Sequence, residues 1–249
     1  MPLSEPTDFL PAVTVIVPVK NEADNVAPLI AEIATACAAF AAFEVIYVDD
    51  GSTDATPAVL EEQARTRPWL RRLRHDISRG QSAAVRSGAF AARAPILVTI
   101  DGDGQNDPAF IPSLVRELTE GGSRVGLAAG QRVGRKDTGF KKFQSRVANA
   151  VRGAILRDGT RDTGCGLKAI RREVYLQLPY FDALHRFMPA LVRRDGHEVA
   201  LVDVIDRPRM AGASKYGFFD RLWVGILDLA GVWWLIRRRK APPHVQELR

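Results

Sequence analysis

The chain has 249 residues, 46% of them hydrophobic, and a formal net charge of +6. This length allows one large domain or two small ones with an ample core, and the lack of a low-complexity linker or internal repeat favours one domain. The two cysteines, Cys37 and Cys165, lack the spacing of a metal site, and no basic-then-apolar signal precedes Val13. We therefore expect Cys37 to be a core thiol and the compartment to be a reducing cytosol.

The first half of the chain alternates between short apolar runs and helical patterns. Apolar or β-branched runs bounded by polar residues predict strands, and apolar residues three or four positions apart predict helices. The predicted strands are 13–17, 43–48, 70–74 and 96–100. The predicted helices cover 26–37, about 53–65 with Asp54 as a plausible N-cap, and a stretch that ends near Ala92.

The second half continues in the same way. A helix is expected from Pro108 to Gly121, and residues 140–156 predict a basic helix. The remaining predicted elements are strands at 125–130, 167–171 and 199–204 and short helices at 173–178 and 183–194. Strands that end in polar loops, with helices between them, describe an open α/β sheet. Ligands of such sheets bind outside the carboxyl ends of the strands.

Two carboxylates, Asp101 and Asp103, follow the apolar run 97–100. Residues i and i+2 of an extended backbone face the same side, so both carboxylates can point into one cleft. The glycines at 102 and 104 let a bulky ligand approach the backbone. Paired carboxylate oxygens suit Mg²⁺ or Mn²⁺, which in turn hold phosphates. The alternative is an acidic turn, because Asp-Gly is common in turns.

Several motifs carry a family resemblance. Ile-Val-Pro-Val-Lys-Asn-Glu at 16–22, Val-Asp-Asp-Gly-Ser-Thr-Asp at 48–54 and Asp-Gly-Asp-Gly-Gln at 101–105 resemble family 2 glycosyltransferases of the GT-A fold. Arg-Asp-Thr-Gly-Cys-Gly-Leu-Lys at 161–168 and Arg-Pro-Arg-Met-Ala-Gly-Ala-Ser-Lys-Tyr at 207–216 are similar to its polyprenyl-phosphate branch. That branch includes dolichol-phosphate mannose synthases and bacterial undecaprenyl-phosphate sugar transferases. The resemblance implies an α/β, Rossmann-like, mostly parallel central sheet flanked by helices.

The resemblance implies residues for a nucleotide-sugar donor and a metal ion. Asp50 is expected to read the base or ribose, with Asp49 supporting its loop, and turn capping is the alternative role for Asp50. Asp101, Asp103 and Gln105 are expected to bind Mg²⁺ or Mn²⁺, which would stabilise charge on the departing diphosphate. The other expected nucleotide-binding residues are Pro18, Asn21, Glu22, Arg79 and Gly80, together with Asp101.

Asp103 and Asp162 are the expected catalytic residues. In the family the position of Asp162 lies near the reacting sugar, where it would orient a hydroxyl or stabilise positive charge at the anomeric carbon. A loop cap is the alternative role for Asp162. His185 is interpreted as a structural hydrogen-bonding residue in preference to a catalyst.

The acceptor that the resemblance implies is a lipid monophosphate. Its phosphate is largely dianionic at neutral pH, so it needs cations to hold it and no strong general base. Lys141 stands where an arginine is frequent, which keeps the charge but loses the fork geometry. Simple surface charge is the alternative role for each of these cations. The expected acceptor-phosphate residues are Arg132, Lys141, Ser145, Arg209, Ser214 and Lys215.

Positive charge is concentrated at 132–172, which contains twelve Lys or Arg and three acidic residues. Such a surface suits an anionic ligand, a lipid phosphate or a membrane. Nucleic acid is disfavoured as a partner, because no nucleic-acid-binding module is present and few aromatic residues are available for base stacking.

The tail combines an apolar helical stripe between Phe219 and Trp234 with Arg237-Arg-Arg-Lys240. Its apolar part is too short to span a membrane, and Asp228 interrupts it, so we expect an amphipathic helix on an anionic membrane surface. Packing on the domain core, a homo-oligomer and a small membrane partner are the alternatives. The expected division is a transferase domain over 1–217, the helix over 218–240 and a tail over 241–249.

The resulting prediction is a metal-dependent, inverting glycosyltransferase, bound peripherally at the cytoplasmic face of a membrane. It would move a sugar from a nucleotide-sugar, with UDP preferred, to polyprenyl phosphate. Transfer from GDP-mannose to polyprenyl or dolichyl phosphate is the near alternative, and a soluble family 2 enzyme with a glycan acceptor is less favoured. The intact Asp101, Asp103 and Gln105 argue against a non-catalytic sensor of sugar nucleotides.

Overall fold

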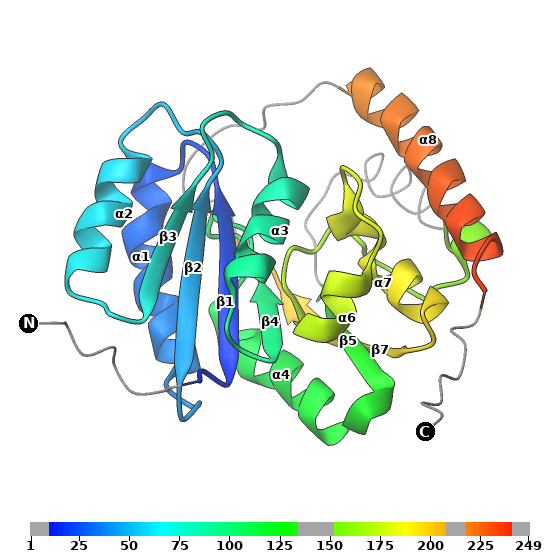
Figure 1. Ribbon diagram of the computed structural model, residues 1–249, viewed down its shortest axis with the longest axis horizontal. Coiled ribbons are helices and arrows are strands. Elements are labelled where there is room, and N and C mark those ends of the chain that lie inside the picture. Colours follow the sequence, from blue (N-terminus) through cyan, green and yellow to red (C-terminus); the bar gives the residue numbers. More distant parts are fainter. Residues whose placement is uncertain (1–9, 134–151, 208–217, 241–249) are drawn as a thin grey trace, which may run out of the picture.

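The computed structural model describes residues 10–133, 152–207 and 218–240 (Figure 1). Seven strands form one central sheet, and each lies where the sequence predicted a strand. Their bounds are β1 Val13–Val19, β2 Phe43–Asp49, β3 Leu70–Arg74, β4 Ile96–Thr99, β5 Val125–Val133, β6 Lys168–Arg171 and β7 Glu198–Ile205. The strands β1, β2, β4 and β5 are mostly buried, apolar runs, whereas β3 and β7, at the two edges of the sheet, carry many exposed or partly exposed residues. The predicted α/β class with a mostly parallel sheet is thus confirmed.

The strand order is β3-β2-β1-β4-β6-β5-β7. All neighbouring pairs are parallel except those of β6, which is antiparallel to both β4 and β5. Its register places Lys168 opposite Thr99 of β4 and Ala129 of β5. Because β6 alone is reversed, the carboxyl ends of the other six strands lie at the same edge of the sheet.

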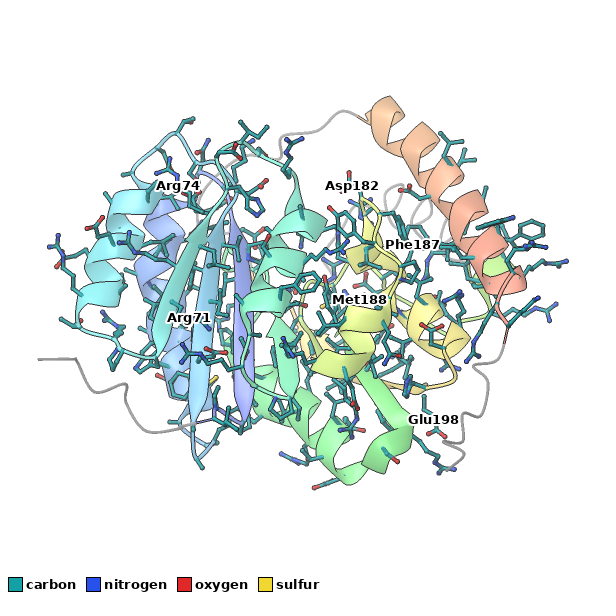
Figure 2. All side chains as sticks on the ribbon, viewed as in Figure 1. Arg71, Arg74, Asp182, Phe187, Met188 and Glu198 are labelled. Atoms are coloured by element: carbon teal, nitrogen blue, oxygen red, sulfur yellow. The ribbon has the colours of Figure 1, made fainter. Side chains whose placement is uncertain are left out.

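Helices cover both faces of this sheet and enclose two hydrophobic cores. Their bounds are α1 Ala23–Cys37, α2 Thr56–Arg65, α3 Gln81–Ala91, α4 Ile111–Glu120, α6 Arg172–Gln177, α7 Leu184–Arg194 and α8 Phe218–Arg237. One core lies between the sheet and α1, α2 and α4, and it includes Cys37. The other lies under α3, α6 and α7, where Phe187 and Met188 are buried (Figure 2).

Three predicted helix starts differ from the observed ones by three residues, the first being α1, which begins at Ala23 and not at 26. Helix α2 begins at Thr56, three residues after the predicted start, although the carboxylate of Asp54 still accepts the Thr56 N–H at 2.9 Å. Pro108 opens a 3₁₀ turn, Pro108–Phe110, and α4 follows it. Of the predicted basic helix, residues 152–156 belong to the described part of the chain, and they are helical.

Helix α8 has one face on the domain and one face in solvent. Val232 is 1% exposed, and Leu229, Leu235 and Ile236 pack against the core under α7. Arg194 of α7 donates a hydrogen bond from Nε to the carbonyl oxygen of Leu235 at 3.0 Å. Among the described residues, no helix is both long and apolar enough to span a bilayer. The division of the chain at 217 and 240 stays a prediction.

Candidate active site

The carboxyl ends of β1, β2, β4 and β5 bring the predicted motifs to one edge of the sheet (Figure 1). Pro18 lies within β1, opposite Val48 of β2. The loops that follow β1, β2, β3 and β4 carry the remaining donor motifs, and Arg132 lies one residue before the end of β5. These segments therefore lie at the carboxyl edge of the sheet, where ligands of open α/β sheets bind.

Asp50 fastens the end of β2 to the loop before α3. Its Oδ1 lies 2.7 Å from Nδ1 of His75 and accepts the Arg79 N–H at 2.8 Å. Its Oδ2 accepts hydrogen bonds from the Ser78 hydroxyl at 2.7 Å and the Gly80 N–H at 2.8 Å. Burial favours the neutral acid, but these four bonds outweigh it and lower the pKa of Asp50. The arrangement fits the capping alternative, and contact with a base or ribose stays a prediction.

Asp49 and Gly51 complete this corner. Asp49 is buried, its Oδ1 accepts the Ser52 N–H at 2.9 Å, and its Oδ2 lies 3.4 Å from Nε of Arg74 at the end of β3 (Figure 2). Gly51 has a φ of +69°, and a Cβ there would lie 2.9 Å from the backbone nitrogen of Ser78. Both facts require glycine, so the two loops approach as closely as backbones allow.

The loop after β1 is tied to the same corner. Asn21 has a φ of 54°, its N–H donates to the Ser52 hydroxyl at 2.9 Å, and its Oδ1 accepts the Thr53 N–H at 2.8 Å. The Glu22 N–H donates to the Thr56 hydroxyl at 2.9 Å. These bonds hold the backbone of the β1 loop against the start of α2, and the roles of Asn21 and Glu22 toward a nucleotide stay predictions.

Asp101 lies between the first turn of α3 and the turn that precedes β6. Gln81 donates from Nε2 to its Oδ1 at 2.7 Å, and a Cβ added to Gly166 would overlap its carboxylate. Burial and the charge of Asp103 raise the pKa of Asp101 to about 6, although the charge of Lys168 acts in the opposite direction. The two carboxylates are therefore close enough to repel each other, and a cation between them would favour the ionised form of both.

The acidic loop, residues 101–105, suits a divalent ion for which the protein supplies only part of the ligands. The Gln105 N–H donates to Oδ1 of Asp103 at 3.1 Å, which turns the loop back on itself. Within the described residues, no group of three or more His, Cys, Asp or Glu side chains could hold a metal. Two carboxylates suit an ion such as Mg²⁺, which takes further ligands from water and phosphate oxygens. Asp101 and Asp103 would hold it, and the role of Gln105 stays a prediction.

Asp162 is clamped by the last residues of β5. Oε1 of Gln131 accepts the Asp162 N–H at 3.0 Å, and Nε2 of Gln131 donates to the Asp162 carbonyl oxygen at 3.2 Å. Arg132 grips the carboxylate with a fork, through Nε to Oδ2 and through Nη2 to Oδ1 at 2.9 Å. Forked, charge-assisted pairs of this kind are strong and directional, so the carboxylate has a fixed orientation.

Arg132 therefore lies between carboxylates, where the sequence analysis expected a phosphate-binding cation. Its Nη1 also lies 3.3 Å from Oδ2 of Asp206. Burial opposes the charge, but the hydrogen bonds and charge of Asp162, aided by Asp206, raise the pKa of Arg132. Binding of acceptor phosphate by Arg132 stays a prediction. Five further expected acceptor residues lie outside the described part of the chain: Lys141, Ser145, Arg209, Ser214 and Lys215.

The start of α3 joins the donor loops to α7. Gly80 has a φ of +86° and directly precedes α3, while the side chain of Arg79 is exposed. Nδ1 of His185 lies 2.9 Å from the Ser82 hydroxyl. Burial, with the charges of nearby cations, lowers the pKa of His185 to about 3, so the ring is neutral at pH 7. This geometry fits the structural role expected for His185.

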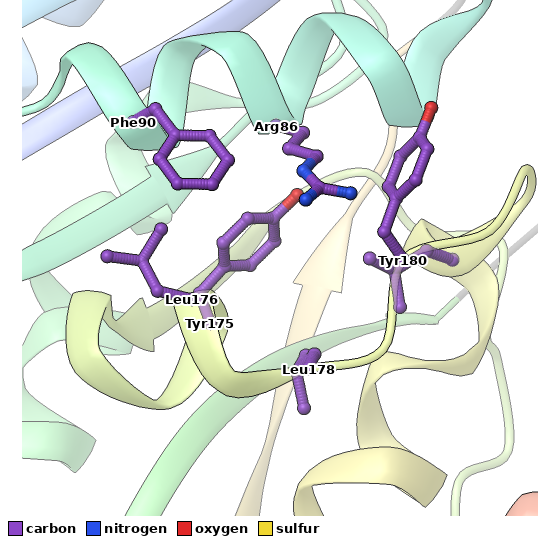
Figure 3. A pocket seen from close by; sticks show the side chains of 7 residues that line it. Arg86, Phe90, Tyr175, Leu176, Leu178 and Tyr180 are labelled. Atoms are coloured by element: carbon purple, nitrogen blue, oxygen red, sulfur yellow. The ribbon is translucent and has the colours of Figure 1, made fainter.

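A shallow pocket lies away from these loops, between α3 and α6 (Figure 3). The guanidinium of Arg86 stacks over the ring of Tyr180, 4.2 Å from its centroid, and lies 5.3 Å from the ring centroid of Phe90. No carboxylate is among the described residues that line it. The strand ends therefore remain the candidate active site.

Some residues of the site were missed by the sequence analysis. Gln81, Asn106, Gln131, Lys168 and Asp206 each contact or act electrostatically on a predicted site residue. Asn106 and Gln131 stand next to predicted residues at strand ends, so their position was an available signal. Gln81 follows the predicted residue Gly80, and Lys168 ends the motif at 161–168. Their effects on Asp101, like that of Asp206 on Arg132, depend on contacts between distant segments that the sequence pattern does not reveal.

Comparison with known proteins identifies the class. The model of the family described as Glycosyl transferase family 2 matches residues 14–178, so the chain belongs to that family. A mannosyltransferase from Pyrobaculum calidifontis, solved with GDP-Man and Mn²⁺, has a similar fold, with a TM-score of 0.67 and 24% identity over 94% of this chain and 67% of its own. The glucosyl-3-phosphoglycerate synthase of Mycobacterium tuberculosis has a TM-score of 0.66 at 20% identity, over 94% of this chain and 82% of its own. The GT-A fold is thus confirmed.

Two curated relatives indicate which branch of the family this chain resembles. The dodecaprenyl-phosphate galacturonate synthase of Rhizobium johnstonii is 36% identical over 93% of this chain and 69% of its own length. The undecaprenyl-phosphate 4-deoxy-4-formamido-L-arabinose transferase of Pectobacterium carotovorum is 31% identical over 85% of this chain and 64% of its own. The expected resemblance to polyprenyl-phosphate sugar transferases is confirmed, and the chain spans about two thirds of the length of these relatives.

Proposed function

We propose that this chain transfers one sugar from a nucleotide-sugar to a polyprenyl phosphate. The observation that carries the proposal is that Asp101, Asp103 and Asp162 lie at the same edge of the sheet and that the first and last of them share cationic neighbours. Arg132 acts electrostatically on both Asp101 and Asp162, and so does Lys168. The names of the two curated relatives support a polyprenyl-phosphate acceptor.

The chemistry that this site supports is an in-line displacement. An oxygen of the acceptor phosphate attacks the anomeric carbon, the bond from that carbon to the diphosphate breaks, and the nucleoside diphosphate leaves with the electron pair. The configuration at the anomeric carbon is therefore inverted. No general base is required, because the acceptor phosphate is already anionic at neutral pH. The carboxylate of Asp162 would stabilise positive charge at the anomeric carbon.

Asp101 and Asp103 are the residues that would hold Mg²⁺ or Mn²⁺. When bound, a divalent ion offsets the negative charge that develops on the departing diphosphate. Structures of the two fold relatives contain Mn²⁺, which supports the use of a divalent ion here. We infer a UDP-sugar donor, with GDP-mannose as the alternative, and neither curated relative's name specifies a nucleotide.

The outer face of α8 supports peripheral attachment to an anionic membrane. Leu227 is 68% exposed, Trp234 is 55% exposed, and Ile226 and Trp233 are exposed beside them. The guanidinium of Arg237 lies 4.6 Å from the ring centroid of Trp233, and three more cations follow it in the sequence. A surface of tryptophan, aliphatic residues and cations matches the interface between headgroups and acyl chains. On this proposal, the acceptor meets the site at the cytoplasmic leaflet.

The experiment is direct. Purified protein is incubated with undecaprenyl phosphate, with either Mg²⁺ or Mn²⁺, and with UDP-sugars and GDP-mannose in separate reactions. The lipid products are identified by mass. We expect one UDP-sugar to give a lipid-linked monosaccharide only when a divalent ion is present. Product from GDP-mannose alone would establish the alternative donor, and product without lipid phosphate would contradict the proposed acceptor.

A further inference from the structure

A chain of polar side chains runs between the acidic loop after β4 and Asp162. It begins at Asn106, which is 2% exposed. Oδ1 of Asn106 accepts the Asp101 N–H at 3.3 Å, and its Nδ2 donates to Oδ1 of Asp206 at 3.1 Å. The backbones of Asn106 and Asp206 also pair as an isolated antiparallel bridge. The amide of Asn106 therefore links the backbone of the acidic loop to the end of β7.

The chain continues from Asp206 to Asp162. Oδ2 of Asp206 lies 3.3 Å from Nη1 of Arg132, and the same guanidinium grips Asp162 with its two other nitrogens. The side chains of Arg132, Asp206 and Asp162 are each less than one fifth exposed. Each therefore depends on its neighbours for hydrogen bonds that water would otherwise supply.

Because these hydrogen bonds are linked, moving one side chain of the network would break the bonds of the next. A buried polar group left without its partner is destabilising, so the members of the chain keep their places together. Arg132 has three nitrogens in a rigid plane, so fixing Nη1 on Asp206 also fixes the fork that holds Asp162. The direction of the Asp162 carboxylate is in this way set from the Asp101 loop, through Asn106.

We propose that Asn106 and Asp206 are positioning residues, which set the Asp162 carboxylate relative to Asp101. The inference rests on the proposed function, because it gives Asp162 a task at the anomeric carbon. Neither residue touches the substrate in this account. Asp206 acts on Asp162 through Arg132, and Asn106 acts through Asp206, so their effects on Asp162 are those of one unit and are not independent.

A double-mutant cycle tests this unit. Asn106→Ala removes the amide, and Asp206→Asn keeps the size of the side chain while removing its charge toward Arg132. Each single variant should lower kcat about thirtyfold, because a carboxylate misplaced by about 1 Å loses up to a hundredfold in rate. The donor KM should stay within about threefold of wild type. The double variant should be no more than about threefold slower than either single variant, because the unit is already broken.

Independent effects would give a double variant slower by roughly the product of the two losses, about a thousandfold, and that result would overturn the inference. A single variant that keeps wild-type kcat would overturn it equally. Asp203→Asn is the matched control, because it removes a carboxylate from the same strand whose ion pair with Arg161, at 2.6 Å, is exposed. Its kcat should equal that of wild type.

A second readout needs no turnover. Calorimetric Kd values for UDP with Mn²⁺ are measured for the same variants, since Asp206 holds the amide of Asn106 and that amide holds the backbone of Asp101. We expect about threefold weaker binding in each single variant and no further loss in the double. Wild-type protein that makes no lipid-linked sugar contradicts the proposed function. In that case the Kd values alone test the inference. A double variant whose loss of affinity equals the product of the two single losses would overturn it.

Discussion

The carboxyl edge of the sheet and the outer face of α8 differ in how their side chains are held: the first by hydrogen bonds within the protein, the second hardly at all. At the sheet edge, carboxylates are held by donors from distant segments, as the four bonds to Asp50 and the fork on Asp162 show. On α8, Leu227 and Trp234 are apolar and exposed. At the sheet edge, contacts within the protein hold charged groups in fixed positions, whereas on α8 apolar side chains face solvent.

This difference separates two kinds of recognition. Fixed charges in a partly buried site suit a small, highly charged ligand, because preorganised groups need no rearrangement when charge develops. An exposed apolar stripe beside cations suits an extended surface, which needs no unique geometry. Substitution of a single polar group at the sheet edge should therefore change activity strongly. Binding by the α8 face should depend on how much exposed apolar area and positive charge it keeps.

The largest expected effect is at the acidic loop. Asp103→Asn should lower kcat about a thousandfold, because it removes about 4 kcal/mol of transition-state stabilisation. The melting temperature should change little, since the variant keeps the shape of the side chain. Lipid-sugar formation is measured at saturating Mg²⁺ and at saturating Mn²⁺. Rates near wild type with both ions would remove Asp103 from the metal site.

The next effect is on stability. Asp50→Ala leaves four donors without their acceptor and should cost about 3 kcal/mol of unfolding free energy, measured in urea at pH 7. Donor affinity should fall with it, because the loop before α3 loses its anchor. Thr53→Ala, an exposed change in the same loop, is the control. An Asp50→Ala protein as stable as the control would show that the four bonds contribute nothing net.

The acid dependence of stability follows from the same carboxylate. The pKa of Asp50 is lowered in the folded protein, so its ionised form stabilises the fold above the unfolded pKa of about 4. That contribution should disappear as the pH falls from about 4 through the lowered folded pKa. Urea unfolding of wild type and Asp50→Asn between pH 6 and pH 2 measures it. The difference between the two proteins should shrink as the pH falls, and a constant difference would contradict the linkage.

A smaller loss of stability is expected at Gly166, whose backbone contacts the carboxylate of Asp101. Gly166→Ala places a Cβ against the Asp101 carboxylate, and relief of the overlap should cost about 2 kcal/mol of stability. Affinity for Mn²⁺ with UDP should weaken as well, because Asp101 must move. Gly153→Ala is the control, since a Cβ there meets nothing within 4 Å. Unchanged binding by Gly166→Ala would mean that Asp101 does not contact the ion.

The smallest effect belongs to α8. Leu227→Ser with Trp234→Ser should weaken binding to anionic vesicles roughly tenfold, from about 1.5 kcal/mol of lost apolar contact. The melting temperature should not fall, because both side chains are exposed. Phe90→Ser, which removes an exposed ring from α3, should bind vesicles as wild type does. High salt should weaken binding of all three proteins, since the cationic part is screened. Equal vesicle binding by the α8 variant would contradict the membrane proposal.

The strands β1, β2, β4 and β5 could be predicted because each is a mostly buried, apolar run, whereas the edge strands β3 and β7 contain many exposed or partly exposed residues. The helix of Val26, Leu29, Ile30, Ile33 and Cys37 was equally clear, and all five side chains are buried. Helix starts were less clear, because Asp54 and Pro108 are compatible with more than one local turn. Propensity decides an element's type more firmly than its first residue.

The site was predictable only where its residues are adjacent in sequence. Asp101 and Asp103 are one residue apart, so the geometry of one strand end brings them together. Arg132 was assigned to phosphate because its charge was visible, whereas its partners Asp162 and Asp206 lie 30 and 74 positions away. A pairing at that distance depends on the order of strands in the sheet, which no local pattern encodes.

The reversed strand β6 has a consequence for how the chain is made. The sheet places β6 between β4 and β5, and the two described neighbours of β5 are β6 and β7, both later in the chain. During synthesis, β1 to β4 can assemble as a parallel unit while the free edge of β4 stays unpaired until Arg171 has emerged. Insertion of β6 then closes that edge and joins the two halves of the site in one event. A nascent chain that stops before Lys168 would carry the donor loops on a four-stranded sheet whose apolar β4 edge is unpaired, and such an edge is prone to pair with other chains.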